Sequence, residues 1–224
     1  MAFGKFFVGA VAAVLLASSA EAAVVYDQPT NNAGGFSSQN DTNNSVGIWT
    51  NFDNFTLGSS ANLSSVSFVG SYFDGPPSTG AITGFTIAIY ADNSGVPASS
   101  ALYSVTLPGN GHETSLGPDN LGFPEFSYSE NISFAALAGT EYWLSIVPDL
   151  GFPPQWAWEN GTGGDGLGYQ TYSLDATLNG ATTADSAFAL YDNTGQVPEP
   201  LTLSLFGAGL SGAVAMRRLR KRPA

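Results

Sequence analysis

Hydrophobic and polar residues alternate in short runs through most of this chain. Between Phe85 and Tyr90, the apolar side chains of Phe85, Ile87 and Ile89 fall at every second position. Successive side chains of a β-strand point to opposite faces, so this pattern predicts a strand with one buried face. Three more runs alternate in the same way, with the apolar sets Val66, Phe68 and Tyr72; Tyr103, Val105 and Leu107; and Tyr142, Leu144 and Ile146.

No stretch between the two ends of the chain has the period of an amphipathic helix. Further strands are predicted at 24–26, 48–57, 123–128, 132–137, 155–159, 168–172 and 187–191. Turn residues separate them, as in Asp92-Asn93-Ser94-Gly95, where Gly95 supplies a positive φ. The polar stretch Asn31–Ser45 is expected to be a long surface loop. The pattern predicts an all-β fold, a single jelly-roll-like β-sandwich of about ten short strands over residues 23–195.

The N-terminal end has the three parts of a secretory signal peptide, which we assign to residues 1–22 and expect to be helical. Lys5 gives a positive start, the stretch Phe6–Ala17 is the apolar core, and Ala20-Glu21-Ala22 is a small-x-small cleavage site. Cleavage after Ala22 by a signal peptidase makes Ala23 the first residue of the mature protein. A chain with this signal is exported, and the Sec translocon is its expected route.

The C-terminal end predicts a membrane anchor. Residues 201–216 carry no charge, and as a helix they would be about 24 Å long, somewhat shorter than a bilayer core. The tail at 217–224 is basic, with Arg217, Arg218 and Arg220 nearest the apolar run. Because basic residues stay on the cytoplasmic side, the tail is expected inside and the domain before it outside. The alternative for 201–216 is a buried core helix.

Residues 196–200 form a linker that contains the sequence Pro198-Glu199-Pro200. This motif, the Leu- and Gly-rich apolar run and the terminal arginine cluster follow in fixed order, and together they resemble a PEP-CTERM sorting signal. The resemblance implies an exopolysaccharide-producing Gram-negative bacterium. It also implies an exosortase, a membrane-embedded cysteine transpeptidase-like enzyme that recognises Pro198, Glu199 and Pro200 and removes the tail. The middle of the chain is similar, at 53–57, 85–97, 141–146 and 187–191, to uncharacterised β-rich exported domains, which implies no activity.

The composition of the predicted ectodomain removes several classes of function. From Val24 to Pro198 there is no Lys, Arg, Cys or Met, whereas all 18 acidic residues except Glu21 and Glu199 lie in this segment. Without cations to neutralise phosphates, the domain is not expected to bind nucleic acid or an anionic lipid surface. Each carboxylate must be solvated, hydrogen-bonded to a neutral donor or bound to a metal, because no Lys or Arg can pair with it.

Two patterns point to a ligand. Trp156 and Trp158 lie on one face of a predicted strand beside Glu159 and Asn160, and exposed indoles with nearby polar groups suit a sugar. The alternative is that the indoles belong to the core. Near the Gly-rich stretch 161–168, the acids Asp149, Glu159 and Asp165 are candidate ligands for calcium, which prefers carboxylate and carbonyl oxygens.

No residue stands out as catalytic. His112 is the only histidine, which excludes a multi-His metal site, and no Ser or Cys lies in a nucleophile motif. Paired carboxylates leave a glycoside hydrolase open as the third interpretation.

The first interpretation is an exported, non-enzymatic protein of the cell surface or extracellular matrix, sorted by an exosortase and associated with exopolysaccharide. Before processing it would be anchored in the inner membrane, with its ectodomain in the periplasm. The second is a carbohydrate-binding, lectin-like module that uses calcium. We expect no cofactor other than calcium.

Overall fold

The computed structural model describes residues 22–73 and 82–193, which belong to one compact unit spanning Ala22–Gly195. The described residues are all-β apart from one turn of 3₁₀-helix, η1 (Ala176–Leu178). The strands are β1 (Ala23–Gln28), β2 (Thr30–Ser37), β3 (Gln39–Asp41), β4 (Ile48–Thr56), β5 (Ala61–Tyr72), β6 (Gly84–Asp92), β7 (Pro97–Pro108), β8 (Thr114–Pro118), β9 (Pro124–Ala136), β10 (Glu141–Leu150), β11 (Trp156–Gly161), β12 (Gly168–Tyr172), β13 (Gly180–Thr182) and β14 (Phe188–Asp192).

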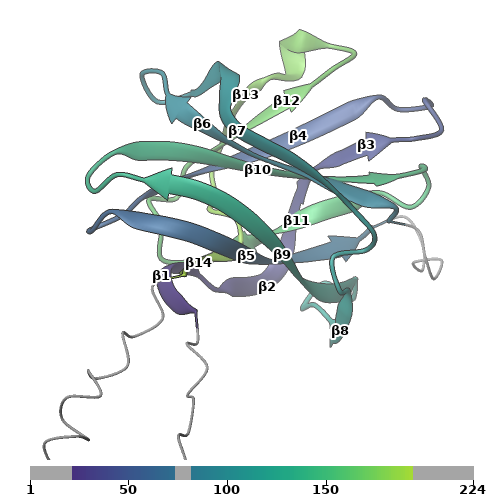
Figure 1. Cartoon of the computed structure of the whole chain (residues 1–224). Helices are drawn as coiled ribbons and strands as arrows, with labels where there is room; N and C mark the ends of the chain where they lie inside the picture. The colour runs from purple at the N-terminus through teal and green to yellow at the C-terminus, as the bar shows by residue number, and fades with distance from the viewer. Residues whose placement is uncertain (1–21, 74–81, 194–224) are drawn as a thin grey trace, which may run out of the picture. The chain divides into compact units, whose positions relative to one another are not determined.

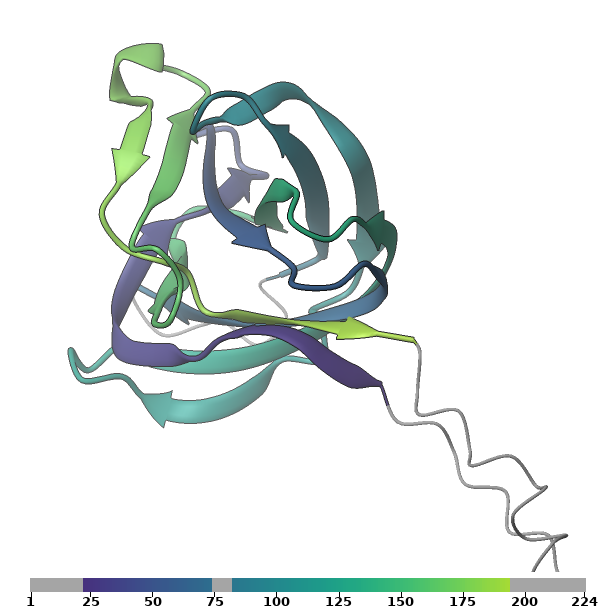
Figure 2. The ribbon, with the colours of Figure 1, turned by 90° about the vertical axis from the view of Figure 1, so that its left-hand side faces the viewer.

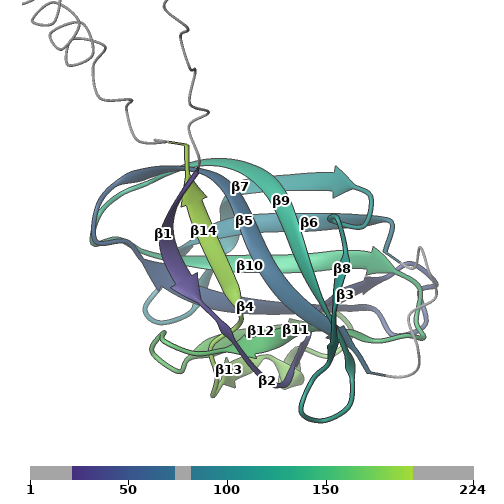
Figure 3. The ribbon, with the colours of Figure 1, turned by 90° about the horizontal axis from the view of Figure 1, so that it is seen from below.

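These strands form two seven-stranded sheets, one above the other in Figure 1. In the first sheet, the long strand β5 pairs with β9 on one side and with β14 and β11, end to end, on the other. β1 pairs with β14, β2 with β11, and β8 with β9, all antiparallel. Figure 3 shows β1, β14, β5 and β9 side by side.

The second sheet has the strand order β13-β12-β4-β3-β10-β6-β7. The short strand β3 pairs with β10 in the parallel sense, whereas the other pairs are antiparallel. β4 also pairs directly with β10 where β3 is absent. Both sheets are curled, as the view in Figure 2 shows.

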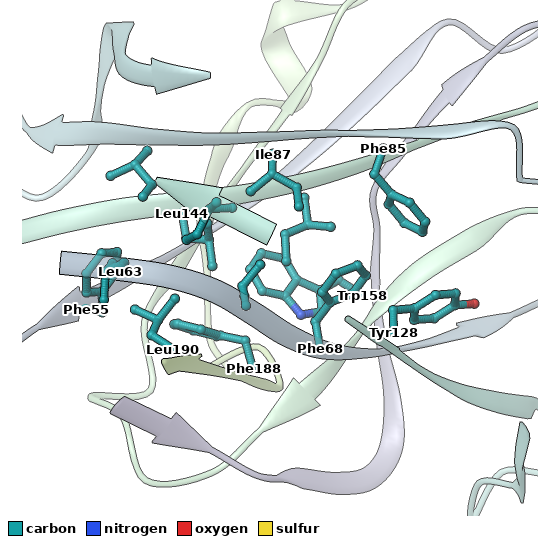
Figure 4. Close-up of a cluster of buried hydrophobic side chains, with 14 of the residues drawn as sticks. Phe55, Leu63, Phe68, Phe85, Ile87, Tyr128, Leu144, Trp158, Phe188 and Leu190 are labelled. Carbon is teal, nitrogen blue, oxygen red and sulfur yellow. The ribbon is translucent and has the colours of Figure 1, made fainter. Parts of the chain in front are cut away.

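The hydrophobic core lies between the two sheets. In Figure 4, Phe68, Phe188 and Leu190 of the first sheet face Ile87 and Leu144 of the second. The buried faces predicted for β5, β6 and β10 are confirmed, since Val66, Phe68, Tyr72, Phe85, Ile87, Ile89, Tyr142, Leu144 and Ile146 are all buried. The predicted face of β7 is confirmed as well, because Tyr103, Val105 and Leu107 pack against the core.

Aromatic rings fill much of this core. The Phe68 and Tyr128 rings stack with centroids 5.2 Å apart, and the Phe85 ring meets the edge of Tyr128 at 5.4 Å. The Trp156 indole lies directly over Gly70 of β5, where an added Cβ would be 2.1 Å from the ring. Gly70 is therefore required by the size of its cross-strand neighbour.

The prediction that Asn31–Ser45 forms one long surface loop is wrong, because most of this stretch lies in β2 and β3. β2 pairs with β11 through its backbone, which does not require apolar alternation. The two backbones approach closely at Gly35, where a Cβ would lie 2.0 Å from the Trp158 carbonyl oxygen. Asp41 then closes the turn after β3 by accepting backbone N–H groups of Asn43, Ser45, Val46 and Phe152.

The strand count is also higher than the predicted ten or so, at fourteen in the described residues. The strands predicted at 123–128 and 132–137 are one continuous strand, β9. The polar residues Ser129, Glu130 and Asn131, which resemble a turn in the sequence, pair with residues 65–67 of β5. Next to them the register shifts between Leu63 and Ser65 of β5, where β9 contains one extra residue. β8 and β13 are further short strands without apolar alternation.

The turn between β6 and β7 matches its prediction. Gly95 has a φ of +84°, and its N–H donates to the Asp92 carboxylate at 3.0 Å. The same carboxylate oxygen accepts the Trp143 indole N–H at 3.0 Å. Asp92 thus links the turn to the neighbouring strand β10.

Several sequence predictions lie outside the described residues. They are the signal segment up to residue 21, the linker at 196–200, the transmembrane helix at 201–216 and the basic tail at 217–224. Within residues 22–73 and 82–193, no helix has the length and apolar character needed to cross a membrane.

Candidate functional site

The two tryptophans of the predicted sugar site are core residues. Trp156 and Trp158 are fully buried on the inner face of β11, so neither can stack on a ligand. Trp156 donates its indole N–H to the Tyr128 hydroxyl at 3.2 Å, and Trp158 donates to the Ala187 carbonyl at 2.9 Å. Because a buried indole needs a partner for its N–H, these bonds explain how both rings are accommodated. The prediction of a sugar-stacking surface at these residues is wrong, and the core alternative is confirmed.

Glu159 and Asn160 do not form an exposed site either. Glu159 points away from the two indoles and is fully buried; the Ser71 hydroxyl donates to its Oε1 atom. Its Oε2 atom has no hydrogen-bond partner among the described residues. Burial, with a smaller contribution from the charges of Glu125 and Asp119, raises the pKa of Glu159 to about 7. Asn160 is half-buried, and its backbone pairs with Ser186.

The candidate calcium ligands are not brought together. Asp149 lies near the end of β10 in the second sheet, where it accepts the Asn40 amide at 2.7 Å. Glu159 lies in the first sheet, and Asp165 lies in the loop that follows β11. No group of three or more His, Cys, Asp or Glu side chains within the described ranges is arranged to hold a metal ion. The structure therefore does not bring Asp149, Glu159 and Asp165 together as one set of ligands.

The Gly-rich loop between β11 and β12 is fixed by one aspartate. The Asp185 carboxylate accepts the Gly164 N–H at 3.0 Å with one oxygen and the Gly166 N–H at 2.7 Å with the other. Gly164 fits tightly, because a Cβ there would lie 2.3 Å from the Gln28 side-chain oxygen. The loop is thereby held against Gln28 of β1, and its residue Asp165 reaches Asn54 of β4 in the second sheet.

This loop forms one wall of an open pocket of about 300 Å³, which we call the Asn54 pocket. Its lining brings together β1, β4, β10 and the Gly-rich loop, and so joins both sheets. The lining residues are Tyr26, Asn54, Phe55, Thr56, Glu141, Gly163, Gly164 and Asp165.

Asn54 organises the polar side of the pocket. Its amide nitrogen donates to Glu141 Oε1 at 2.8 Å and to Asp165 Oδ2 at 3.0 Å. The Leu167 N–H donates to the other oxygen of Asp165 at 3.0 Å. A neutral amide thus holds two carboxylates together where no Lys or Arg is present. Because each carboxylate oxygen can accept more than one hydrogen bond, the pair can still accept donors from a ligand.

Behind the pocket wall, hydrogen bonds lead to a buried acid. The Tyr26 hydroxyl donates to the Gln28 side-chain oxygen at 2.5 Å, and the Gln28 amide donates to Asp53 Oδ2 at 2.7 Å. The Ser186 N–H donates to the same Asp53 oxygen. Burial is the largest cause that raises the pKa of Asp53 to about 8, so this acid is largely protonated at neutral pH. Burial also raises the pKa of Tyr26, and the charges of Asp53, Asp185 and Asp165 add to the effect.

Of the polar pocket residues, only Asp165 was a sequence candidate. Tyr26, Asn54 and Glu141 belong to three strands that are distant in the sequence. The sequence contains one indication of the role of Asn54. A polar residue between Phe52 and Phe55 in a strand must find a hydrogen-bond partner when it is buried. That indication does not say which carboxylates the partners are.

No protein-family model matches this sequence, and no curated protein is significantly similar to it. The Asn54 pocket is therefore interpreted from its own geometry.

Proposed function

We propose that this chain is an exported, non-enzymatic protein of the cell surface or extracellular matrix. An exosortase sorts it through Pro198, Glu199 and Pro200, and the delivered domain associates with exopolysaccharide. In this proposal the two curled sheets are the layers of a jelly-roll-like β-sandwich, which is presented outside the cell. The inner-membrane form with a periplasmic ectodomain is the precursor.

The observation that carries the proposal is the position of the two ends of the described fold. β1 begins at Ala23, directly after the expected signal cleavage, and β14 ends at Asp192, before the linker at 196–200. Ala23 pairs with Asp192, so the two ends lie side by side (Figure 2). Removal of the signal peptide and of the tail would leave every described strand intact. A domain with these boundaries suits processing at both ends.

The burial of Asp53 and Glu159, the two acids whose pKa values are raised most, supports a non-enzymatic role over a glycoside hydrolase. Such a hydrolase needs an accessible carboxylic acid whose pKa is raised, with a second carboxylate across the scissile bond. Asp53 and Glu159, whose pKa values are raised to about 8 and about 7, are both fully buried. A substrate cannot reach them in this fold.

The proposal is tested by the fate of the tail in an exopolysaccharide-producing Gram-negative host that contains an exosortase. A variant with Pro198→Ala, Glu199→Ala and Pro200→Ala should stay in the inner membrane with its arginine cluster, whereas the wild type loses it. The double variant Gln196→Ala, Val197→Ala alters the adjacent linker and should be processed normally. Intact masses of the protein from membrane and surface fractions report both cuts. Processing of the triple variant like the wild type, or retention of the tail by the wild type, would refute the proposal.

A further inference from the structure

We propose that the Asn54 pocket binds a neutral, hydroxyl-rich saccharide. The inference rests on the proposed function, because it names a ligand class for a surface protein associated with exopolysaccharide. It places the sugar site away from Trp156 and Trp158, at residues contributed by both sheets.

The pocket has the size and lining of a small-ligand site. Its volume of about 300 Å³ is at the small end of the range for such sites, which suits one sugar residue and part of a neighbour. The half-buried Tyr26 ring packs against the Phe55 ring with centroids 5.9 Å apart and provides an apolar wall. The apolar face of a pyranose ring can contact such a wall.

The polar side of the pocket is suited to hydroxyl groups. Glu141 and Asp165 are held by the Asn54 amide at 2.8 and 3.0 Å, and their remaining lone pairs accept further donors. Hydroxyl groups that donate to a carboxylate form charge-assisted hydrogen bonds, which are stronger than neutral ones. The exposed Thr56 hydroxyl can donate or accept at the rim. The pocket therefore matches several hydroxyls on one apolar ring.

The charge of the pocket selects a neutral ligand. Two carboxylates line it, and the segment from Val24 to Pro198 contains no Lys or Arg. A uronate, sulfate or phosphate group would meet only negative charge there, from the half-buried Glu141 and the exposed Asp165, and like charges repel.

The amide orientation argues against a bare metal ion. The Asn54 NH₂ group donates to both carboxylates, so its hydrogens occupy the position between them that a cation would need. Across the described part of the chain, no group of three or more acidic, His or Cys side chains is arranged to hold a metal.

The pocket is formed before a ligand binds. The Asp185 carboxylate accepts the N–H groups of Gly164 and Gly166, and Gly164 packs too closely for a Cβ, so contacts within the protein hold the loop wall. A preformed site avoids the entropic cost of ordering a loop on binding.

The test uses the full chain, purified in a zwitterionic detergent that contains no sugar. The probes are neutral tetrasaccharides of glucose (cellotetraose and maltotetraose), mannose and galactose, with an oligogalacturonate as the acidic comparison, each titrated by calorimetry. At least one neutral probe should bind, and the oligogalacturonate should not. Glu141→Gln and Asp165→Asn should each weaken binding by about tenfold or more, since each removes a charged acceptor. Asp27→Asn, an exposed aspartate on the same strand as Tyr26, is the charge-matched control and should bind like the wild type.

Melting temperatures of all variants separate loss of binding from loss of fold. If Glu141→Gln or Asp165→Asn melts early, Thr56→Val takes its place, because it removes only an exposed hydroxyl. Four results would overturn the inference: no neutral probe binds; the pocket variants bind like the wild type; the oligogalacturonate binds as tightly as the neutral probes; or calcium chloride alone gives a binding heat that the variants lose. The saccharide titrations and the tail-processing experiment measure different properties. A negative titration would therefore refute the saccharide site without refuting the proposed sorting.

Discussion

Replacing Asp53 by Asn isolates the largest pH effect that the structure predicts for a carboxyl group in residues 22–73 and 82–193. Asp53 is fully buried, and its Oδ2 atom accepts hydrogen bonds from the Gln28 amide and the Ser186 N–H. The carbonyl oxygen of an asparagine can accept both bonds. The substitution therefore removes the ionisation and keeps the shape and the hydrogen bonds.

The sign and size follow from linkage. Burial is the main cause that raises the pKa of Asp53 from 3.8 to about 8. Between these values the folded state binds more protons than the unfolded state, so the stabilising contribution is fully present below pH 3.8 and is lost as the pH rises through 8. At about 1.4 kcal/mol per pH unit, the loss is on the order of 5 kcal/mol. Glu159, with its pKa raised to about 7, gives a smaller loss in the same direction.

Asp41 has the opposite effect on the pH dependence of stability, because its pKa is lowered on folding. Although burial alone would raise the pKa of Asp41, the backbone N–H groups of Phe152, Val46, Asn43 and Ser45 outweigh this effect and lower it. A lowered pKa contributes stability above the ordinary value of 3.8 that is lost as the pH falls through the folded-state pKa. The free energy of unfolding should therefore be highest near pH 4 and decrease toward pH 8.

Urea unfolding followed by tryptophan fluorescence measures this profile between pH 4 and pH 9. The Asp53→Asn variant should match the wild type near pH 4 and be more stable by several kcal/mol near pH 8. Asp27→Asn removes the same charge from an exposed position and should follow the wild-type profile. The reasoning is refuted if wild-type stability stays flat or rises from pH 5 to pH 8. It is equally refuted if Asp53→Asn loses as much stability as the wild type over that range.

Two further predictions concern packing and proteolysis. Gly70→Ala should lower the free energy of unfolding by several kcal/mol, because its Cβ would lie 2.1 Å from the Trp156 ring; Gly58→Ala, with no atom within 4 Å, should change it by less than about 1 kcal/mol. Equal urea midpoints for these two variants would contradict the packing described for Trp156. Trypsin should not cut between Ala23 and Pro198 even in the urea-unfolded chain, because no Lys or Arg occurs there, whereas chymotrypsin should cut the unfolded chain rapidly and the folded chain slowly. Mass spectrometry identifies the fragments that trypsin and chymotrypsin produce. Rapid chymotryptic cleavage of the folded form would count against a compact domain.

The buried faces of β5, β6, β7 and β10 could be predicted from local alternation alone. Phe85, Ile87 and Ile89 were placed on one face by a two-residue period, and all three are fully buried in β6. The period is a property of the extended backbone itself, so it does not depend on which strand lies alongside. The position of Gly95 in its turn was readable for the same reason, since a positive φ is a local requirement.

Strand pairing and burial of polar groups were decided by contacts between distant segments. β2 is polar along most of its length. It is a strand because its backbone pairs with that of β11, where Gly35 of β2 lies opposite Glu159. The sequence placed Glu159 beside a possible ligand, whereas the fold buries it against Ser71. The two indoles could equally have been surface or core residues, because the same alternation describes both until the opposite sheet is known.

The Asn54 pocket depends most on tertiary structure. Asn54, Glu141 and Asp165 meet only because β4 pairs with β10 and the loop after β11 is fixed by Asp185. The absence of Lys and Arg between Val24 and Pro198, visible in the sequence, determined that the acids of this segment would need neutral partners. Which amide, hydroxyl or backbone N–H became each partner was set by the arrangement of the two sheets, because hydrogen bonds act only over short distances between groups that the fold has already brought together.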